Sequence, residues 1–241
     1  MHTRLRLGAV ADIHGNFGAL RRAMSRHPDV PAWLCVGDLA SRTGTYPEPI
    51  APLYWIKGNN ENFDSVATWE TGARQPRHLH LIPNGTAVRV GPLRVAGLGG
   101  TYAPTWFDTP AAALPHTPRD DKRRHFVREE VDACTRLRGI DVLMTHEAPR
   151  PFILVDDPSA LPHGRSRRRD AGKTVINELL ATMKPRLHLC GHHHRFIESV
   201  RNGVRSVCID RINRSYLLID ADTLDYEKLD NLDAAEPEKD G

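Results

Sequence analysis

The sequence predicts a layered α/β fold. Short apolar segments typical of β-strands alternate along the 241 residues with longer segments of helical spacing, which is the pattern of sheets covered by helices. No internal repeat, long linker or low-complexity tract interrupts this alternation. A chain of this length can bury a substantial core, as one large domain or two small ones. We predict one domain over residues 1–219 and an acidic C-terminal tail over residues 220–241.

The first half of the chain combines predicted strands with one amphipathic helix. Phe17, Leu20 and Met24 have helical spacing on one face, which predicts a helix after the first strand and its loop. Gly91 and Pro92 separate two apolar segments and predict a β-hairpin. The predicted strands are Leu5–Ala11, Trp33–Val36, Leu53–Lys57, Thr86–Val90 and Leu93–Leu98.

The second half contains two predicted helices and a series of short strands. Phe126, Val127 and Val131 fall near one face of a helix predicted over Asp121–Leu137, and a second helix is predicted over Ala171–Met183. The predicted strands are Val142–Thr145, Leu187–Cys190, the hairpin formed by Ile197–Val200 and Val204–Ile209, and finally Tyr216–Ile219.

Composition excludes several classes of protein. The chain has 40% hydrophobic and 26% charged residues, which argues against wholesale disorder. No segment approaches ~18 consecutive apolar residues, so we predict no transmembrane helix, and the N-terminus lacks a secretion-type cleavage site. The four cysteines form no CxxC pair of the metal-binding type, so we expect reduced thiols and a cytoplasmic protein.

The net charge of +3 conceals an uneven distribution. Residues 220–241 hold nine acidic and two basic residues, a net of −7, which leaves about +10 on residues 1–219. Of the 33 basic residues 27 are arginines, and guanidinium groups bind phosphate in a bidentate manner. The arginine-rich body suits an anionic ligand, although a general preference for arginine explains the same composition.

Five predicted strands end in side chains that can bind metal ions. These side chains are Asp12 and His14, Asp38, Asn59, His146, and His192 and His194. In open α/β sheets, ligands bind beyond the carboxyl ends of the strands, so these residues are expected to converge. Residues at i and i+2 of an extended segment point to the same side, which pairs Asp12 with His14 and His192 with His194 and turns His193 away. Carboxylate, imidazole and amide oxygen together suit Mn²⁺, Fe²⁺, Zn²⁺ or Ni²⁺.

The order of these residues resembles that of the motifs in calcineurin-like metallophosphoesterases. Each motif is weak alone, but five in family order, each after a predicted strand, are specific. The motifs are D-x-H (Asp12, His14), G-D (Gly37, Asp38), G-N-N-E (residues 58–61), T-H (His146) and G-H-x-H (His192, His194). The resemblance covers roughly residues 5–200. It implies a four-layer αββα sandwich, in which two mixed sheets pack face to face with helices outside.

The resemblance also implies two divalent metal ions. The implied ligands are Asp12, His14 and His194 for one ion, Asn59, His146 and His192 for the other, and Asp38 as the bridge between them. Manganese is the first expectation for both ions, with iron, zinc and nickel as alternatives. Two such ions ~3.5–4 Å apart can share a hydroxide for in-line attack on a phosphoester and stabilise both the attacking and the leaving oxygen.

One position departs from the family pattern. The family motif G-N-H carries a histidine thought to protonate the leaving oxygen or to contact phosphate, and this chain has Asn60 in its place. An amide is not a general acid, and losing acid catalysis typically costs ~10²–10⁴-fold in rate. Asn60 is predicted to position phosphate through its NH₂ group, with Glu61 orienting the loop. Otherwise a histidine from elsewhere serves as the acid, the candidates being His78, His80, His116 and His125.

Several further segments offer clues to the substrate. Arg150, four residues after His146, is a candidate phosphate ligand. The glycine-rich backbone of Gly97–Tyr102 could approach a phosphate, and Tyr102 or Trp106 could stack on a base. The alternative is a simple glycine turn with packed aromatic rings. Residues 119–124 and 165–169 are basic and could bind a polyanion, although a solvated helix start and an exposed loop explain them more simply.

The sequence thus predicts a metal-dependent hydrolase of a phosphodiester or nucleotide, in which Asp38, Asn60 and Arg150 act on the substrate. Residues 97–102 and 141–150 look like their counterparts in RNA lariat debranching enzymes, a branch of the same superfamily. Asp12 stands where those enzymes usually carry cysteine, so the debranching activity does not transfer. The alternatives are a nuclease or lariat-type RNA phosphodiesterase, and a non-catalytic scaffold on the same fold. We expect a phosphate-ester substrate, with nucleotides and nucleic acids among the candidates, and no membrane partner.

Overall fold

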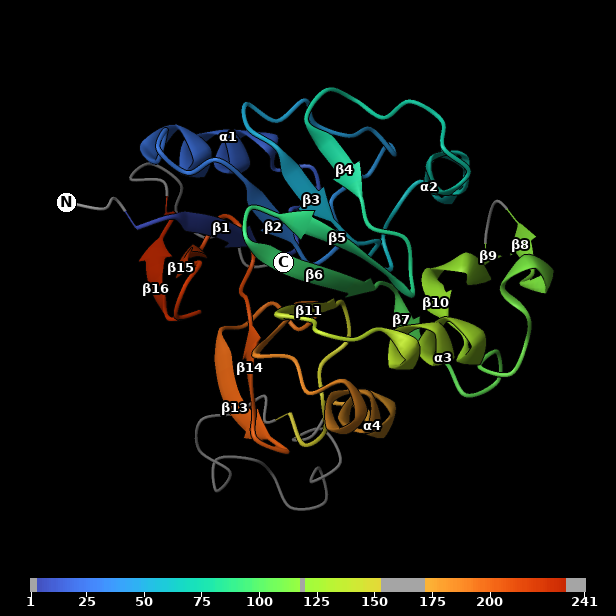
Figure 1. The fold of residues 1–241 in the computed structure, drawn as a ribbon. Helices are drawn as coiled ribbons and strands as arrows, with labels where there is room; N and C mark the ends of the chain where they lie inside the picture. The colour runs from blue at the N-terminus through green and yellow to red at the C-terminus, as the bar shows by residue number, and fades with distance from the viewer. Residues whose placement is uncertain (1–3, 118–119, 153–171, 233–241) are drawn as a thin grey trace, which may run out of the picture.

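Two six-stranded sheets form the centre of the protein (Figure 1). The computed structural model describes residues 4–117, 120–152 and 172–232. The strand order is β16-β15-β1-β2-β3-β4 in the first sheet and β13-β14-β12-β11-β6-β5 in the second. Both sheets are mixed, with four neighbouring parallel strands in each. The carboxyl ends of four parallel strands therefore meet at one edge of each sheet.

The strands are short, and most were predicted. The first sheet consists of β1 (Arg6–Val10), β2 (Trp33–Cys35), β3 (Leu53–Trp55), β4 (Leu79–Leu81), β15 (Ser215–Asp220) and β16 (Tyr226–Asp230). The second consists of β5 (Thr86–Val90), β6 (Leu93–Leu98), β11 (Val142–Thr145), β12 (Leu187–Cys190), β13 (Ile197–Arg201) and β14 (Val204–Cys208). The predicted hairpin of β5 and β6 is present with the predicted bounds.

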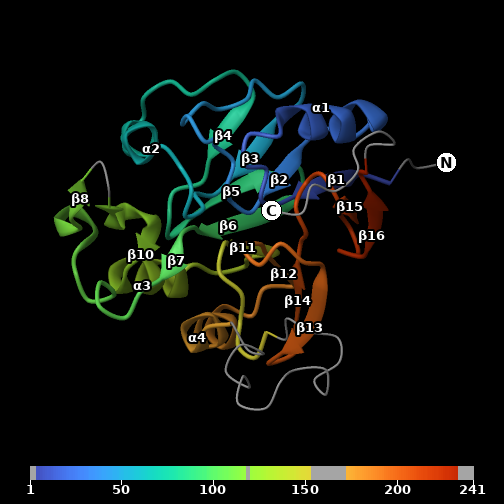
Figure 2. The same ribbon diagram turned by 180° about the vertical axis from the view of Figure 1, so that it is seen from behind.

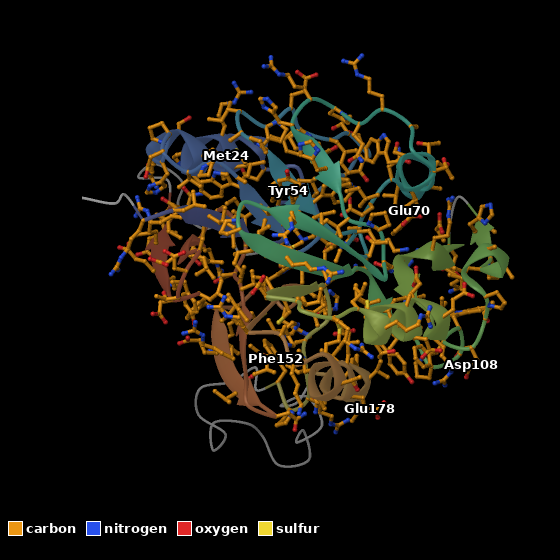
Figure 3. The ribbon with its side chains drawn as sticks, in the orientation of Figure 1. Met24, Tyr54, Glu70, Asp108, Phe152 and Glu178 are labelled. Carbon is orange, nitrogen blue, oxygen red and sulfur yellow. The ribbon has the colours of Figure 1, made fainter. Side chains whose placement is uncertain are left out.

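Helices cover the outer face of each sheet (Figure 2). The first sheet is covered by α1 (Phe17–Arg26) and α2 (Phe63–Glu70), and the second by α3 (Arg128–Arg136) and α4 (Thr174–Met183). Met24 on α1 and Glu178 on α4 lie on opposite sides of the paired sheets (Figure 3). This four-layer arrangement confirms the predicted αββα sandwich.

Alternation along the strands divides most of the buried apolar side chains between one core that separates the two sheets and one core under each helix layer. In β1, Leu7 and Ala9 pack between the two sheets, whereas Val10 packs on the side of α1. In β11, Met144 packs between the sheets and Leu143 packs on the side of α3 and α4. Because both faces of each sheet are covered, the central strands are apolar at almost every position.

The predicted helix over Asp121–Leu137 is wrong in its first part. The helix begins only at Arg128, because β10 pairs with β7 in parallel and buries Phe126 completely. This tertiary pairing outweighs the helical spacing of the segment. Between β6 and α3 the chain forms β7 (Thr101–Tyr102), a 3₁₀ turn (Ala111–Ala113), β8 (His116–Thr117), β9 (Asp120–Asp121), a second 3₁₀ turn (Lys122–Arg124) and β10 (His125–Phe126).

Besides β16, helix α2 and strand β4 of the first sheet and its helix layer were not predicted. Helix α2 begins after Asn62, whose side chain accepts a hydrogen bond from the Ser65 N–H, a typical N-cap signal. Strand β4 has only three residues and pairs with β3 at the edge of the sheet. The helix predicted from Ala171 begins at Thr174 in the structure, and its predicted first residue lies outside the described residues.

A buried lysine joins the two halves of the sandwich. Lys57, which follows β3, is 7% exposed, and its Nζ lies 3.9 Å from Glu70 of α2 and 3.7 Å from Glu130 of α3. Figure 3 shows Glu70 on α2, at the side of the molecule where α2 and α3 approach each other.

The longest helices among the described residues have 10 residues, and none combines the length and apolar character needed to span a membrane.

The first sheet continues into the segment that was predicted as an acidic tail. Strand β16 pairs with β15 in antiparallel fashion, so the ordered sheet extends ten residues beyond the predicted boundary at residue 220. The next residue, Asn231, is fully buried. Its Nδ2 donates to the carbonyl oxygens of Ala19 (3.1 Å) and Ile212 (2.7 Å), which ties the end of β16 to α1.

Replacing Asn231 by alanine is expected to lower the free energy of unfolding by about 1–3 kcal/mol, because it removes buried hydrogen bonds. Denaturant unfolding followed by circular dichroism measures the change. Leu232→Ala is the control, since the Leu232 side chain is largely exposed and its loss should change stability by less than about 0.5 kcal/mol. Equal stability of the two variants would contradict a structural role for Asn231.

Candidate metal centre

Two clusters of metal-binding side chains meet at the carboxyl ends of the parallel strands. The first cluster consists of Asp12, His14, Asp38 and His194, and the second of Asp38, His146 and His192. Within each cluster, one donor atom per residue lies within 4.8 Å of the others. Asp38 belongs to both clusters, as the sequence predicted for a bridging ligand.

In the first cluster, two imidazole nitrogens lie close together and near two carboxylates. The Nε2 atoms of His14 and His194 are 3.0 Å apart. His14 Nε2 lies 3.6 Å from an oxygen of Asp38, and His194 Nε2 lies 3.6 Å from an oxygen of Asp12. Two nitrogens and two carboxylate oxygens at these separations are a donor set that fits a divalent transition-metal ion.

In the second cluster, an amide oxygen joins the histidines. His146 Nε2 lies 2.9 Å from Asn59 Oδ1 and 3.5 Å from Asp38 Oδ1. The rings of His146 and His192 are neighbours, with centroids 5.0 Å apart. The backbone carbonyl of Val36 lies 2.8 Å from Nδ1 of His146, so Nδ1 donates its proton there and Nε2 is left to face the cluster. The structure thus gathers Asn59, His146 and His192 beside the Asp38 carboxylate.

The backbone at the clusters is left-handed, not extended. Five of the seven predicted ligands have positive φ, namely Asp12 (48°), His14 (46°), Asp38 (54°), His192 (71°) and His194 (53°). The residues at i and i+2 do converge as predicted, but the reason given by extended geometry is wrong. Each left-handed residue turns the chain sharply past the end of its strand, and such conformations cost free energy and concentrate at functional sites.

Asn60 holds the shared carboxylate in place. Its backbone N–H donates to Asp38 Oδ1 and its side-chain Nδ2 donates to Asp38 Oδ2, each at 2.8 Å. The NH₂ group that was predicted to contact phosphate therefore lies on Asp38. Gly58 allows this close approach, because a Cβ atom at that position would lie 2.0 Å from Asp38 Oδ1.

The charges of the second cluster stabilise one another. Burial raises the pKa of Asp38, but His146 and the Asn60 hydrogen bonds outweigh it and hold that pKa below its usual value. Burial lowers the pKa of His146, but Asp38 and Asp12 outweigh it and the pKa is raised. For His192, burial and the neighbouring His146 lower the pKa to about 4, so its imidazole is neutral at neutral pH, the form that binds metals.

Glu61 joins the two loops that carry Asp38 and Asn59. Its carboxylate accepts hydrogen bonds from the backbone N–H groups of Leu39 (3.0 Å), Ala40 (3.1 Å) and Gly58 (3.1 Å). Burial and the nearby Asp38 raise the pKa of Glu61 to about 7 in spite of these hydrogen bonds. The position agrees with the predicted role of Glu61 in orienting the loop.

A series of hydrogen bonds between buried side chains supports the loop of His146, and it was not predicted. His188, fully buried on β12, lies 3.0 Å from Ser206 Oγ through Nδ1 and 2.8 Å from Thr145 Oγ1 through Nε2. Thr145 Oγ1 donates to the carbonyl oxygen of Glu147. This series therefore fixes the backbone on both sides of His146. Thr-His in the T-H motif is the only sequence signal of this arrangement.

His193 turns away from the clusters, as predicted, but it has contacts of its own. Its ring stacks on Phe152 with centroids 4.5 Å apart, and its Nε2 lies 3.5 Å from Glu147 Oε1. Glu147 is 2% exposed and its other oxygen accepts a hydrogen bond from the Tyr102 N–H. His193 thus links the loop that carries His192 and His194 to the loop that carries His146.

A cavity of about 770 Å³ opens beside the clusters. Its lining includes His14, Asn59 and Asn60, together with the basic residues Arg42, His116, Arg123 and Arg124. Two of these arginines come from the basic stretch 119–124, whose predicted role as a solvated helix start is wrong because its described residues, 120–124, form β9 and a 3₁₀ turn. Arg42 gave no sequence signal beyond the general abundance of arginine. The cavity has room for a substrate next to His14 of the first cluster and Asn59, which lies beside the second.

Other candidate residues lie elsewhere. Arg150 is exposed after β11, and its backbone exchanges hydrogen bonds with Asn177 of α4, outside both clusters. Tyr102 packs against Phe107 and Phe126, which favours the packed-aromatic interpretation of its segment. The basic residues 165–169 lie outside the described residues.

The chain matches known proteins over most of its length. A model of the calcineurin-like phosphoesterase family matches residues 5–196. A lariat debranching enzyme of Schizosaccharomyces pombe is 27% identical over 194 residues, which cover 76% of this chain and 42% of that protein. CWF19-like protein 1 of mouse is 23% identical over 209 residues, 80% of this chain and 37% of that protein. The chain therefore spans less than half the length of these curated relatives.

The fold also has counterparts among solved structures. The crystal structure of TT1561 of Thermus thermophilus superimposes with a TM-score of 0.61 at 15% identity, covering 95% of this chain and 100% of that one. At this level of identity the likeness concerns the fold, which is the same two-sheet sandwich.

Gly37 packs closely against His146, so a substitution at Gly37 tests the placement of the metal centre. A Cβ atom at Gly37 would lie 2.6 Å from His146 Nδ1, so Gly37→Ala is expected to displace this histidine and weaken Mn²⁺ binding by about 10–100-fold. Gly72→Ala is a matched control: both glycines have positive φ (+104° and +93°), but nothing lies within 4 Å of a Cβ atom at Gly72. Calorimetric titration with Mn²⁺ measures the affinities, and equal values for the two variants would contradict this placement of the metal centre.

Proposed function

Because the chain belongs to the calcineurin-like phosphoesterase family, we propose that it is a metal-dependent hydrolase of phosphodiesters or nucleotides. The observation that carries the proposal is the Asp38 carboxylate, which both donor clusters share beside a cavity of about 770 Å³ that His14 and Asn59 line. Asp12, His14 and His194 would hold one divalent ion, and Asn59, His146 and His192 the other. Manganese is the proposed ion, with iron, zinc and nickel as alternatives for the same donors.

The chemistry of these donors connects the proposed metal ions to the hydrolysis of a phosphoester. When bound, divalent ions activate water as a nucleophile near neutral pH and neutralise phosphoryl charge. Asp38 sets the spacing of the two clusters through its two oxygens, and Asn60 fixes the rotation of that carboxylate. Arg42 is exposed at the cavity and can contact a phosphoryl oxygen. We keep Arg150 as a candidate phosphate ligand, one that would have to reach the cavity from the loop after β11.

The second candidate function is an RNA phosphodiesterase. Its support is the similarity to a lariat debranching enzyme, together with three arginines along the cavity. Arg123 and Arg124 are already close to carboxylates, at 2.6 Å from Asp121 and 3.7 Å from Asp120 respectively, so their charge is largely compensated. A small phosphodiester or nucleotide therefore remains the first proposal. A scaffold without catalysis is the less supported interpretation, because the sequence retains all seven residues that the family resemblance implies as metal ligands.

Asp38→Asn is expected to reduce the hydrolysis of bis(p-nitrophenyl) phosphate by ~10²–10⁴-fold in the presence of Mn²⁺, since the shared ligand supplies several kcal/mol of transition-state stabilisation. Asp132→Asn is the control, because it makes the same charge change on the exposed face of α3. Initial rates with Mn²⁺, Fe²⁺, Zn²⁺ and Ni²⁺ are measured for both. Wild-type protein inert with every metal and substrate would favour the scaffold.

The two enzymatic candidates differ in their response to substrate length and salt. A small-substrate hydrolase should cleave mononucleotide esters at least as well as single-stranded or branched RNA. An RNA phosphodiesterase should prefer the polymers, with an affinity that falls steeply as salt increases. Comparing kcat/KM for the three substrates at two salt concentrations decides between them.

A further inference from the structure

We propose that His116 is the general acid that protonates the leaving oxygen, in place of the histidine that the family motif carries at position 60. The inference rests on the proposed hydrolase function and adds a catalytic residue to it. His116 comes from β8, in a segment between β7 and α3 that none of the five motifs includes. It therefore approaches the cavity from outside the metal centre.

The need for such a group follows from Asn60. An amide has no proton to donate at the required acidity, so a general acid must come from another residue. The Asn60 side chain is also engaged on Asp38 at 2.8 Å, which holds it on the metal side of the cavity. The leaving oxygen therefore needs a proton from a residue on the side of the cavity away from Asp38.

Among the four histidines considered from the sequence, the cavity selects one. His116 lines it together with His14 and Asn60. His78 lies 3.0 Å from the Pro49 carbonyl oxygen, before β4, and His80 stacks on Tyr54 with ring centroids 4.8 Å apart. Neither of them lines this cavity.

His125 is the remaining candidate, and it is engaged elsewhere. Its Nδ1 lies 3.0 Å from Thr101 Oγ1, where β10 pairs with β7, and its side chain is only half-exposed. It does not line the cavity either. His116, in contrast, is exposed and can reach a ligand.

The segment that carries His116 is tied to α2 by an ion pair. Arg123 Nη2 lies 2.6 Å from Asp64 in the first turn of α2, three residues after Glu61, and 2.6 Å from Asp121. The Lys122 N–H donates to the Pro115 carbonyl oxygen at 2.8 Å, next to His116. Figures 1 and 2 both show β8 on the side of the molecule where α2 lies. The ion pairs of Arg123 therefore hold the segment that carries His116 against α2.

The ring orientation leaves one nitrogen for the substrate. His116 Nδ1 lies 3.3 Å from the Leu114 carbonyl oxygen, which can only accept a proton, so Nδ1 keeps its hydrogen. Nε2 is the atom that can lose one. The charged groups that line the cavity with His116 are Asp120, Asp121, Arg123 and Arg124 from its own segment, and Arg42, Glu61 and Asp64 from the loops after β2 and β3 and the start of α2.

The proposed step conserves atoms and charge. Water attacks phosphorus and releases one proton to solvent, and the bond between phosphorus and the leaving oxygen breaks with its electron pair on that oxygen. The imidazolium of His116 transfers its Nε2 proton to this oxygen and becomes neutral imidazole. It regains a proton from solvent before the next turnover.

A general acid is recognised by its dependence on the leaving group. We propose to measure kcat/KM with Mn²⁺ for methyl aryl phosphodiesters whose leaving groups range from p-nitrophenoxide to the more basic phenoxide. His116→Gln should reduce the rate by ~10²–10⁴-fold for the phenyl ester and by less than about tenfold for the p-nitrophenyl ester, whose leaving group needs no proton. The pH profile of the variant should also lose the limb that reports a protonated acid.

Matched variants distinguish this role from structural effects. His80→Gln makes the same change at the exposed position of the edge strand β4 and should leave both rates unchanged. A uniform loss for all esters in His116→Gln, or a leaving-group effect in His125→Gln instead, would overturn the assignment. Failure of the hydrolase proposal is distinguishable, because wild-type protein would then cleave none of the esters.

Discussion

The site depends on a single buried carboxylate placed between two sets of donors. Asp38 is 1% exposed, its two oxygens each receive a hydrogen bond from Asn60, and imidazole nitrogens approach it from both sheets. His14 comes from the first sheet and His146 from the second, so the carboxylate lies where the two layers meet. Any change in the packing of one sheet on the other would alter the spacing of the clusters. The apolar core between the sheets is in this sense part of the metal centre.

Burial makes this arrangement electrostatically demanding. Asp12 and Asp38 are carboxylates in nearly solvent-free positions, and Glu61, close to Asp38, has its pKa raised to about 7. Partial compensation comes from backbone N–H groups: His192 donates to Asp12, and Leu39, Ala40 and Gly58 donate to Glu61. Bound divalent cations would supply the remaining positive charge. Metal binding and stability of the loops are therefore expected to be coupled in this protein.

The sequence predicted the sandwich and the convergence of the ligands because both follow from short-range patterns. Apolar strands such as Val142–Thr145 and Leu187–Cys190 are covered on both faces, and their polar ends mark the edge of the sheet. The predictions failed where pairing between segments distant in the sequence determines the structure. Phe126 belongs to β10 only because β7 is there to pair with it, and β16 extends the sheet although its composition is that of a solvated tail. The series of hydrogen bonds at His188 could not be predicted for the same reason, since its three members come from three different strands.

The left-handed backbone at five ligands has a consequence for how this site can change in evolution. Besides glycine, the residues that tolerate such conformations best are asparagine, aspartate and histidine, all with short polar side chains. Substitutions to β-branched or bulky residues at Asp12, His14, Asp38, His192 or His194 would strain the loops as well as remove a donor. Neutral drift at these positions is therefore confined to a small set of amino acids, most of which still bind metals. A descendant that lost activity would be expected to keep the shape of the site, with asparagine or glycine where a ligand had been.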